Sequence, residues 1–403
     1  MTYDFSSFPD RRGSGSVKWD SSLPEGVSLT PEQRSRLIPL WVADMDFTVA
    51  PCIREALQKR LDHGVFGYVN VPASYYDAVI RWFADRHGLQ LRREWILYTT
   101  GVIPALSVAI KAFTQPGDGV IVQTPVYNHF FSSIRNNGCR AVASPLLRRE
   151  LPDGRFTYEM DFEDLERCCA DPANRILLLC NPHNPTGRRW SADELRRAGE
   201  IALRHGTLIL SDEIHCEICA PGTAYTPLAS LGEDLLEGSV TLCSPSKNFN
   251  TAGLQMANIF CARADYRERI DRAININEVC DVNPFGPVAV EAAYSEEGAE
   301  WLEGMNAAVW RNYALLLKAF LPEYPVAALE ATYLAWIDVS ALGIPSEEIE
   351  KELIRGEQVW INAGTMYGAD GFIRINLACP DALLREGLDR VLAGLRRLRG
   401  DKN

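Results

Sequence analysis

A lysine directly follows an apolar run that is typical of a buried strand. The segment SPSKNFNTAGLQ, residues 244–255, comes after the run VTLC and contains Lys247. Burying a lysine costs several kcal/mol unless something compensates for the charge. Two interpretations are open at this point. Either Lys247 belongs to a turn and points into solvent, or it is held in place for covalent chemistry.

Four further residues at the ends of apolar runs could take part in chemistry. In TTGVIPALSVAI, Gly101 stands between a strand and a helix, where free backbone N–H groups and the helix dipole favour an anion. TPVYNHF supplies Tyr127, whose ring could form a flat wall. CNPHNPTG supplies Asn184 as a fixed amide, and LILSDEIH supplies Asp212, a carboxylate that needs a partner after an apolar strand. Each also has an ordinary structural interpretation as a turn, a core residue or a helix cap.

Taken together, these groups match one ligand. An anion cradle, an aromatic wall, an amide, a buried acid and a lysine are the parts needed to hold pyridoxal 5'-phosphate. In such a site the acid keeps the pyridine nitrogen protonated, so that the ring can accept electrons. The lysine forms a Schiff base with the aldehyde and then moves the α-proton of the substrate. The sequence therefore favours the covalent interpretation of Lys247.

Six short apolar runs must position these groups. They are unbroken, as expected of strands covered on both faces, and helical patterns lie between them. Helices are predicted over PALSVAIKAF and over SADELRRAGEIALRHG, which has a serine N-cap, early acids and a closing glycine. This spacing predicts crossover units and a mostly parallel sheet, with ligands at the carboxyl ends of its strands. The runs cover residues 95–100, 119–125, 175–182, 207–213, 239–246 and 256–262.

The pattern changes near residue 285, which predicts a second lobe. Downstream lie a long helical segment, the strand-like ATYLAWIDVS, a helix near PSEEIEKELIRG, the run GFIRINLA and the amphipathic DALLREGLDRVLAGLRRL. This mixture of few strands and covering helices indicates a smaller α+β domain. We expect residues 1–50 to form an N-terminal arm and part of the small domain, 51–285 the large cofactor-binding domain, and 286–403 the small C-terminal domain.

Composition limits the partners. The 403 residues carry a formal net charge of -12, which argues against nucleic acid and an anionic membrane. No apolar run approaches the about 18 residues of a membrane span, and the N-terminus lacks the pattern of a secretory signal. Eleven cysteines without regular spacing indicate reduced thiols in the cytoplasm. Cys216 and Cys219 form a C-x-x-C, but no second ligand pair accompanies them, so we expect small buried residues and no metal site.

Over essentially its whole length the sequence resembles the fold-type I, class I/II aminotransferase-like enzymes that depend on pyridoxal 5'-phosphate. Within that group it resembles most the MalY/PatB-type cystathionine β-lyase, or C–S lyase, branch. The motifs that carry this resemblance are SVKWD (16–20), WVADMDF (41–47), GVFGY (64–68), CNPHNPTG (180–187), SDEIH (211–215) and SPSKNFNTAGLQ. The resemblance implies an α/β fold, a three-layer sandwich with a mostly parallel sheet plus a smaller α+β domain.

The resemblance also implies roles around the cofactor ring and phosphate. Lys247 would be the Schiff-base lysine and Asp212 the partner of the pyridine nitrogen. Asn184 would bond to the ring hydroxyl, and Tyr127 would stack on the ring. The phosphate would be bound by backbone N–H groups and hydroxyls from Gly101, Val102, Ile103, Ser244 and Ser246.

Four further positions carry implications for the substrate, the partner subunit and the reaction. Arg374, in FIRIN, would grip the substrate carboxylate in a bidentate manner. Tyr68 resembles a tyrosine that reaches the phosphate of the neighbouring subunit, which implies a homodimer with shared active sites. Gln255 stands where many aminotransferases place a phosphate-binding arginine. His215 stands where some place a tyrosine on the ring oxygen, and both departures favour the lyase branch.

Three functions remain open from the sequence. The first is β-elimination from L-cystathionine or another cysteine S-conjugate, giving a thiol, pyruvate and ammonia. The second is transamination of aromatic or bulky amino acids, which shares the early steps and differs in where the proton returns. The third is a regulatory or partner-binding scaffold. The complete catalytic set around Lys247 argues against a scaffold as the sole role.

Overall fold

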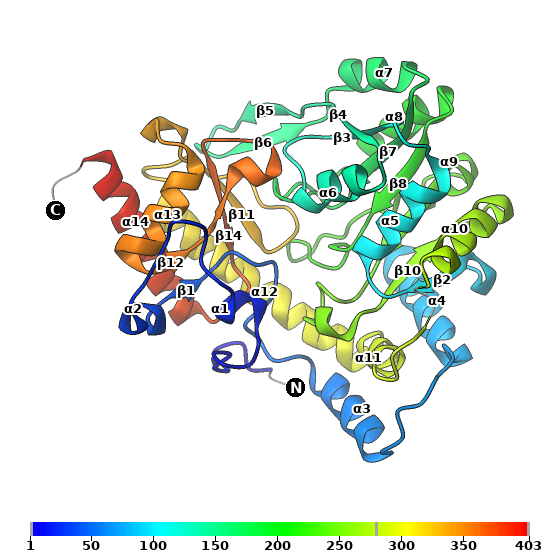
Figure 1. The fold of residues 1–403 in the computed structure, drawn as a ribbon, viewed down its shortest axis with the longest axis horizontal. Helices are drawn as coiled ribbons and strands as arrows, with labels where there is room; N and C mark the ends of the chain where they lie inside the picture. Colours follow the sequence, from blue (N-terminus) through cyan, green and yellow to red (C-terminus); the bar gives the residue numbers. More distant parts are fainter. Residues whose placement is uncertain (1–2, 279–280, 401–403) are drawn as a thin grey trace.

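The computed structural model describes residues 3–278 and 281–400. At its centre lies a seven-stranded sheet in the order β2-β10-β9-β8-β7-β3-β4 (Figure 1). The neighbours from β9 to β4 pair in parallel, whereas β10 runs antiparallel to both β9 and β2. The predicted mostly parallel sheet is therefore confirmed. Its strands are β2 (Ile96–Thr99), β3 (Gly119–Val122), β4 (Arg140–Ala143), β7 (Asn174–Cys180), β8 (Leu208–Asp212), β9 (Ser239–Cys243) and β10 (Ala257–Phe260).

All six predicted runs form strands of this sheet, and burial explains why they are apolar without a break. Every residue of β3, β8, β9 and β10 is buried, because helices cover both faces of the sheet. The seventh strand, β4, was not predicted. It lies at the edge of the sheet and is largely exposed, so its sequence RAVA lacks a continuous apolar run.

Helices cover the sheet in two layers. Along β7, Ile176 and Leu178 pack on one face, and Leu177 and Leu179 pack on the other. This alternation produces the three-layer arrangement that the resemblance implies. The first layer contains α5 (Val102–Phe113), α6 (Asn128–Asn136) and α10 (Ala264–Ile276). The second contains α7 (Phe162–Ala170), α8 (Ala192–Arg204) and α9 (Glu233–Gly238).

The predicted helices begin at the expected signals. Ser191 caps α8: its side chain accepts from the Glu194 N–H at 3.2 Å, and the Glu194 carboxylate accepts from the Ser191 N–H at 2.8 Å. This reciprocal capping box satisfies two otherwise unpaired donors of the first turn. Helix α5 starts directly after Gly101 and has no side-chain cap.

The C-terminal part forms a second sheet with covering helices, as predicted. Its strands pair antiparallel in the order β11-β14-β13. The N-terminal segment joins it, since β1 pairs in parallel with β12 and the blue and orange-red elements lie side by side in Figure 1. The domain limits at residues 50 and 285 stay predictions. The elements are β1 (Ile38–Pro39), β11 (Leu334–Asp338), β12 (Val359–Trp360), β13 (Asn362–Ala363), β14 (Phe372–Asn376), α12 (Glu296–Phe320), α13 (Ser346–Glu357) and α14 (Asp381–Arg399).

The remaining elements connect and extend these two parts. Helix α11 packs against α3 and α4. The strands β5 and β6 form an antiparallel pair. These elements are α1 (Val17–Asp20), α2 (Pro31–Ser35), α3 (Pro51–Asp62), α4 (Ala73–His87), α11 (Gly286–Ala293), β5 (Leu147–Glu150) and β6 (Phe156–Glu159). Short 3-10 helices cover Arg93–Trp95, Leu228–Ser230, Ala252–Leu254, Ser340–Leu342 and Gly364–Tyr367.

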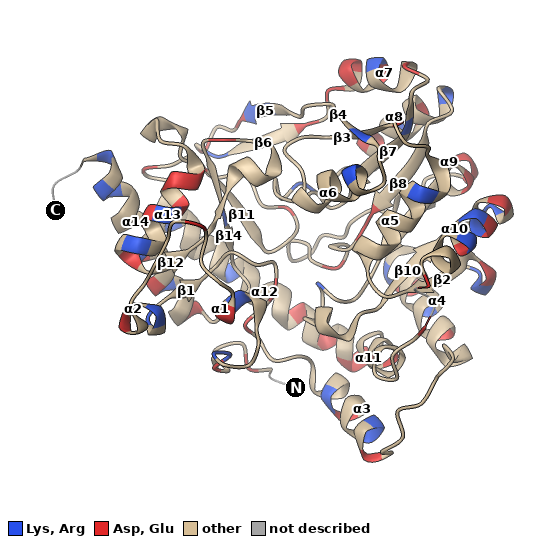
Figure 2. Ribbon diagram, in the orientation of Figure 1, with Lys and Arg blue, Asp and Glu red and all other residues tan. Residues whose placement is uncertain are grey.

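Charge is mixed over the outer helices. Figure 2 shows basic and acidic residues interspersed along α3 and α10. None of the helices in the described ranges is long and apolar enough to cross a membrane.

Candidate active site

A cavity of about 190 Å³ opens where the carboxyl ends of β7 and β8 meet the N-terminus of α5. Parallel strands with helices between them leave such a space at their carboxyl ends, where polar side chains converge. The strand ends bring together most of the residues that the sequence selected. Those that line the cavity are Gly101, Val102, Ile103, Tyr127, Asn184, Asp212, His215, Ser246 and Lys247.

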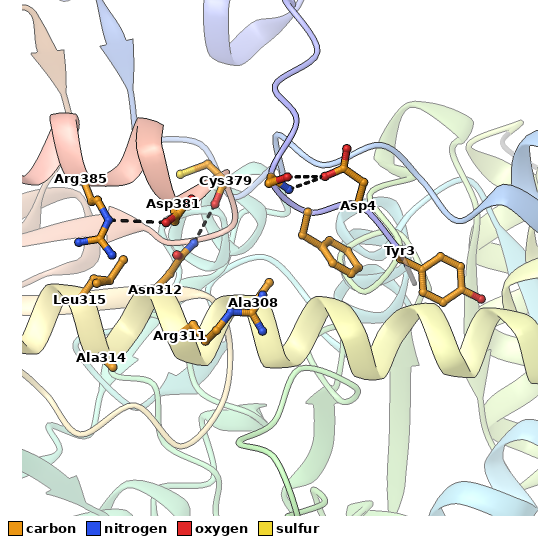
Figure 3. A pocket seen from close by; sticks show the side chains of 12 residues that line it. Tyr3, Asp4, Ala308, Arg311, Asn312, Ala314, Leu315, Cys379, Asp381 and Arg385 are labelled. Carbon is orange, nitrogen blue, oxygen red and sulfur yellow. Dashed lines mark hydrogen bonds and ion pairs between the residues drawn. The ribbon is translucent and has the colours of Figure 1, made fainter. Parts of the chain in front are cut away.

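A larger cavity, of about 730 Å³, lies between the N-terminal arm, α12 and the start of α14. Figure 3 shows Arg385 directed at Asp381 and Asn312 directed at the main chain of Cys379. Neither Lys247 nor Asp212 lines this cavity. The predicted chemistry therefore belongs to the smaller cavity.

Asp212 is the last residue of β8 and is buried. Its Oδ1 accepts a hydrogen bond from the backbone N–H of Ile214 at 3.2 Å. Burial raises the pKa of Asp212 to about 7, although the Ile214 N–H and the charge of Lys247 both oppose that rise. A donor or cation inside the cavity would restore the ionised form. The protonated nitrogen of a pyridine ring is such a donor.

Lys247 lies in the segment between β9 and β10 and faces the cavity. Its Nζ donates a hydrogen bond to the carbonyl of Ala43 at 2.6 Å. Burial lowers the pKa of Lys247 to about 8; the charges of Asp44 and Asp212 oppose this, and that of Arg374 adds to it. A lysine with this pKa has a larger fraction of free amine near neutral pH than an ordinary lysine, and the free amine is the nucleophilic form.

The N-terminus of α5 forms an anion-binding end of the cavity. The first-turn N–H groups of a helix have no partner within the helix, and the dipole favours negative charge there. A Cβ added at Gly101 would meet only Pro104, at 3.4 Å, so the glycine leaves room beside these N–H groups. Gln255 also lines the cavity, and Lys247 is the sole cation among the described lining residues.

The two predicted serines lie at different depths. Ser246 lines the cavity, whereas Ser244 does not. The Ser244 hydroxyl donates to the Met256 carbonyl at 2.6 Å and accepts from the Ser246 N–H at 3.1 Å. Ser244 thus braces the turn that carries Ser246, and its direct contact with a phosphate stays a prediction.

His215 has an unpaired nitrogen. It is buried, and burial together with the charges of Lys247 and Arg374 lowers its pKa to about 3, so the ring is neutral. Its Nδ1 is buried without a hydrogen-bond partner among the described residues. Buried polar atoms are normally paired, so this nitrogen is suited to a ligand in the cavity.

Arg374, on β14, is buried and lies next to the cavity residues. Its Nη1 donates to Asn184 Oδ1 at 3.1 Å, and its Nη2 donates to the Trp41 carbonyl at 2.9 Å. The guanidinium also lies 4.7 Å from the ring centroid of Tyr367. Its Nε has no partner among the described residues, so this N–H and the second hydrogens of Nη1 and Nη2 remain for a carboxylate.

Tyr68 is not brought to the cavity of its own chain. The residue is 97% exposed, beside the exposed Val65 and Phe66. This position is compatible with a contact to another subunit, which stays a prediction.

No role was predicted for residues 41–47, although WVADMDF is one of the motifs that carry the family resemblance. Ala43 lines the cavity and accepts from Lys247, and the charge of Asp44 raises the pKa of Lys247. The acidic residues within the apolar motif WVADMDF were the available signal. The motif could not show that these residues lie next to Lys247, because the two segments are about 200 positions apart in the chain.

Cys216 and Cys219 are buried and free, as predicted. They pack with Tyr225 and Ala331 in a small apolar cluster. In the described ranges no group of three or more His, Cys, Asp or Glu side chains could hold a metal ion.

The cavity suits pyridoxal 5'-phosphate, the cofactor that the sequence predicts. The α5 N-terminus suits the phosphate, and the buried Asp212 suits the pyridine nitrogen. The unpaired Nδ1 of His215 suits a ring oxygen, and the Lys247 amine suits the aldehyde.

Comparisons with known proteins agree with this geometry. The family model described as "Aminotransferase class I and II" matches residues 35–391. The chain is 40% identical to cystathionine beta-lyase PatB of Bacillus subtilis (strain 168) over 397 residues, covering 97% of this chain and 100% of that protein. It is 31% identical to Protein MalY of Escherichia coli (strain K12), covering 98% of this chain and 100% of that protein.

A solved structure shows the same fold. The crystal structure of cystalysin from Treponema denticola, which contains a pyridoxal 5'-phosphate cofactor, matches with a TM-score of 0.91 and 36% identity. The match covers 99% of this chain and 100% of that one. The resemblance predicted from the motifs is confirmed: the chain belongs to the class I and II aminotransferase family.

Proposed function

We propose that this protein is a carbon–sulfur β-lyase dependent on pyridoxal 5'-phosphate. It cleaves L-cystathionine or another cysteine S-conjugate by α,β-elimination to a thiol, pyruvate and ammonia. The observation that carries the proposal is that Lys247, Asp212 and the N-terminus of α5 open into one cavity. The reaction class is supported by PatB, named a cystathionine beta-lyase, and the cofactor by cystalysin, which contains it.

The residues around the ring would divide the work. The cofactor, when bound, supplies an electron sink that stabilises negative charge at the substrate Cα. Asp212 keeps a proton on the pyridine nitrogen, and Lys247 attaches the cofactor and later moves the α-proton. Asn184 and His215, which line the cavity, would bind the ring oxygen, and Tyr127, also in the lining, would stack on the ring.

The cofactor phosphate and the substrate carboxylate would be held by separate groups of residues. Backbone N–H groups of Gly101, Val102 and Ile103, with Ser246 braced by Ser244, bind the phosphate. Arg374 binds the substrate carboxylate, and its unpaired Nε provides one of the N–H groups for that contact.

Elimination is favoured over transamination. Both reactions begin when Lys247 removes the α-proton, so this step does not separate them. They diverge because elimination breaks the Cβ–S bond of the substrate and releases a thiolate, whereas transamination leaves that bond intact and requires a 2-oxo acid acceptor. Gln255 and His215 both line the cavity. At these two positions the sequence departs from many aminotransferases and resembles the lyase branch instead.

We also place the protein in the cytoplasm as a homodimer with shared active sites. The described cysteines are all free, which suits a reducing compartment. Tyr68, exposed beside Val65 and Phe66, would reach the phosphate of the partner's site.

The test is an assay of the purified, yellow protein with L-cystathionine. Pyruvate and free thiol are measured with and without an added 2-oxo acid. We expect both products without the acceptor. Turnover only with the acceptor would indicate an aminotransferase, and no turnover despite bound cofactor would indicate a scaffold.

The control variant is Lys247→Ala. It removes the attachment point, so the visible absorbance of the lysine-bound cofactor is expected to disappear, and activity is expected to fall by at least about 10³-fold. Lys351→Ala, which breaks only a surface ion pair with Glu348, should retain both. Turnover retained in Lys247→Ala would refute the assignment.

A further inference from the structure

Five consecutive backbone carbonyls, those of residues 41–45, each accept a hydrogen bond from the side chain of another segment. We call this segment the carbonyl rail. The accepting distances lie between 2.6 and 3.0 Å. Five of these bonds run from Arg374 to Trp41, Asn376 to Val42, Lys247 to Ala43, Lys18 to Asp44 and Arg11 to Met45. Second bonds come from Asn362 to Trp41, Asn376 to Asp44 and Asn250 to Met45.

The carbonyl rail contacts both groups that an amino-acid substrate must meet. The Ala43 carbonyl accepts from Lys247 at 2.6 Å, and the Trp41 carbonyl accepts from Arg374 at 2.9 Å. An α-amino acid has a fixed separation between its reacting carbon and its carboxylate. The position of the rail therefore affects whether one substrate can reach the amine and the guanidinium together.

A fully buried ion pair anchors the rail. The side chains of Lys18 and Asp46 are both 0% exposed, and Nζ lies 2.7 Å from Oδ2. The same Nζ donates to the Asp44 carbonyl at 3.0 Å, and Trp19 Nε1 donates to Asp46 Oδ1 at 2.9 Å. The Asp46 N–H donates to the Ala378 carbonyl. Buried pairs repay their desolvation only with such complete bonding, and their best-attested use is to fix geometry.

We propose that Lys18 and Asp46 are positioning residues for the active site. Neither lines the cavity; they hold the carbonyl rail so that Ala43 meets Lys247 and Trp41 meets Arg374. The inference rests on the proposed function, because that function gives Lys247 and Arg374 the roles that make their positions important. The competing explanation is that the pair only stabilises the N-terminal arm.

Lys18→Met separates the two explanations. In this variant Asp46 keeps Arg11, 3.0 Å away, and the indole of Trp19, so the buried carboxylate is not left unpaired. If the rail loses its position, Lys247 loses the Ala43 acceptor and the nearby charge of Asp44. The acceptor and the negative charge both favour the ammonium form of Lys247, so their loss lowers the pKa of Lys247. If Lys18 acted on Lys247 only through its positive charge, its removal would instead raise the pKa of Lys247.

The other titratable groups around Lys247 come from elements outside the carbonyl rail. The charges of Asp212 at the end of β8 and Arg374 on β14 act on the pKa of Lys247. The charge of Lys247 in turn lowers the pKa of His215, after β8, and of His129 on α6.

The experiment measures the rate at which pyridoxal 5'-phosphate attaches to the full-length cofactor-free protein as a function of pH. Attachment is followed by visible absorbance, and the rate rises as Lys247 loses its proton. For Lys18→Met we expect the midpoint to fall by roughly half to one pH unit. We also expect KM for L-cystathionine to rise about tenfold. Lys18→Arg, which keeps the charge and the donors, should return the midpoint toward that of wild type.

The matched control is Arg86→Met. It also removes a cation from a buried carboxylate, Glu217, which keeps an indole donor from Trp82 and the ring of His87. This site lies outside the cavity. We expect an unchanged midpoint.

The outcomes are decisive in both directions. A lower midpoint in Lys18→Met with an unchanged Arg86→Met supports the inference. An unchanged or higher midpoint with normal attachment, or an equal shift in the control, overturns it. If Lys18→Met does not fold, Arg11→Met takes its place, since Arg11 reaches the rail at Met45 from the partly exposed side. Absence of attachment in wild type would refute the proposed function instead.

Discussion

Burial sets the protonation state of each titratable group in the cavity. It raises the pKa of Asp212 to about 7 and lowers that of Lys247 to about 8, so each sits far from its ordinary value. His215 is neutral for the same reason. In the cofactor-free protein, burial therefore destabilises the charged forms of Asp212 and Lys247. A ligand with a cationic N–H and a phosphate would relieve this electrostatic cost.

Asp212→Asn is expected to stabilise the cofactor-free protein at alkaline pH. The folded-state pKa of Asp212 lies above the ordinary value, so the folded chain holds a proton that the unfolded chain releases between about pH 4 and pH 7. The free energy of unfolding of wild type therefore falls as pH rises through this window. At pH 8 the variant should be more stable by up to about 4 kcal/mol, and the gap should close toward pH 4.

Denaturant unfolding of both proteins at several pH values measures this gap. Asp370→Asn, at an exposed site whose pKa is lowered by hydrogen bonds from Ser346, serves as the control and should lose stability instead. A gap for Asp212→Asn that does not change with pH would contradict the linkage. The same variant should lose lyase activity, since an amide cannot hold a proton on the pyridine nitrogen.

Arg374→Lys is expected to weaken substrate binding. A lysine cannot donate to Asn184, to the Trp41 carbonyl and to a carboxylate from one planar group. KM for L-cystathionine should rise by about 10- to 100-fold, with a smaller change in kcat. Steady-state kinetics measure this, and Arg355→Lys, at a surface ion pair with Glu352, should behave as wild type. An unchanged KM would remove Arg374 from the carboxylate site.

At the scale of elements, strand register places the catalytic groups. Asp212 pairs with Cys180 of β7 and with Leu242 of β9, so the ends of three strands lie at one level. Lys247 follows β9 by a short turn and therefore reaches the same space as Asp212. Apolar side chains on both faces fix this register, because a shift by one residue would exchange the two faces.

Gly101→Ala is expected to weaken cofactor binding without weakening the fold. The new Cβ would meet only Pro104, at 3.4 Å, an ordinary contact, but it would occupy space beside the first turn of α5. We expect cofactor affinity to fall by about tenfold or more while the unfolding free energy of the cofactor-free protein is kept. Fluorescence titration and denaturant unfolding measure the two quantities.

Ser191→Ala provides the reverse control. It removes the capping box of α8, so stability should fall by about 1 kcal/mol while cofactor affinity stays at the wild-type value. Normal affinity in Gly101→Ala would argue against a phosphate at the N-terminus of α5.

At the scale of the whole molecule, the site joins distant parts of the chain. Residues 41–45 lie between the Lys247 segment and β14, and β1 fastens the same N-terminal segment to β12. Tyr68 is 97% exposed to solvent in the single chain. We therefore expect a second copy to complete the site.

Subunit complementation tests this expectation. Lys247→Ala and Tyr68→Ala should each be impaired as homodimers. In a mixed dimer one site contains both changes and the other contains neither, so coexpression should restore about a quarter of wild-type activity. Activity is measured on the purified mixture. No recovery, or a Tyr68→Ala homodimer as active as wild type, would contradict a shared site.

Much of the fold and of the site could be predicted from sequence. The unbroken runs of β3, β8, β9 and β10 reflect burial on both faces, which leaves a direct trace in composition. The edge strand β4 and the pair β5 and β6 left no such trace, because β4 and β5 are largely exposed and buried residues alternate with half-buried ones in β6. Ala43 and the Lys18–Asp46 pair were missed as functional positions, since their contact with the site depends on chain segments meeting far apart in sequence.

The sequence by itself determined the chemical set: a lysine, an acid, an amide, an aromatic ring and a helix start, each placed after an apolar strand. Local hydrophobic patterns suffice for this, because strand and helix periods are properties of neighbouring residues. Only the tertiary structure decided that Ala43 accepts from Lys247 and that His215 Nδ1 lacks a partner among the described residues. Those facts depend on burial and on long-range packing, which set hydrogen bonding and pKa values and leave no mark in any short segment.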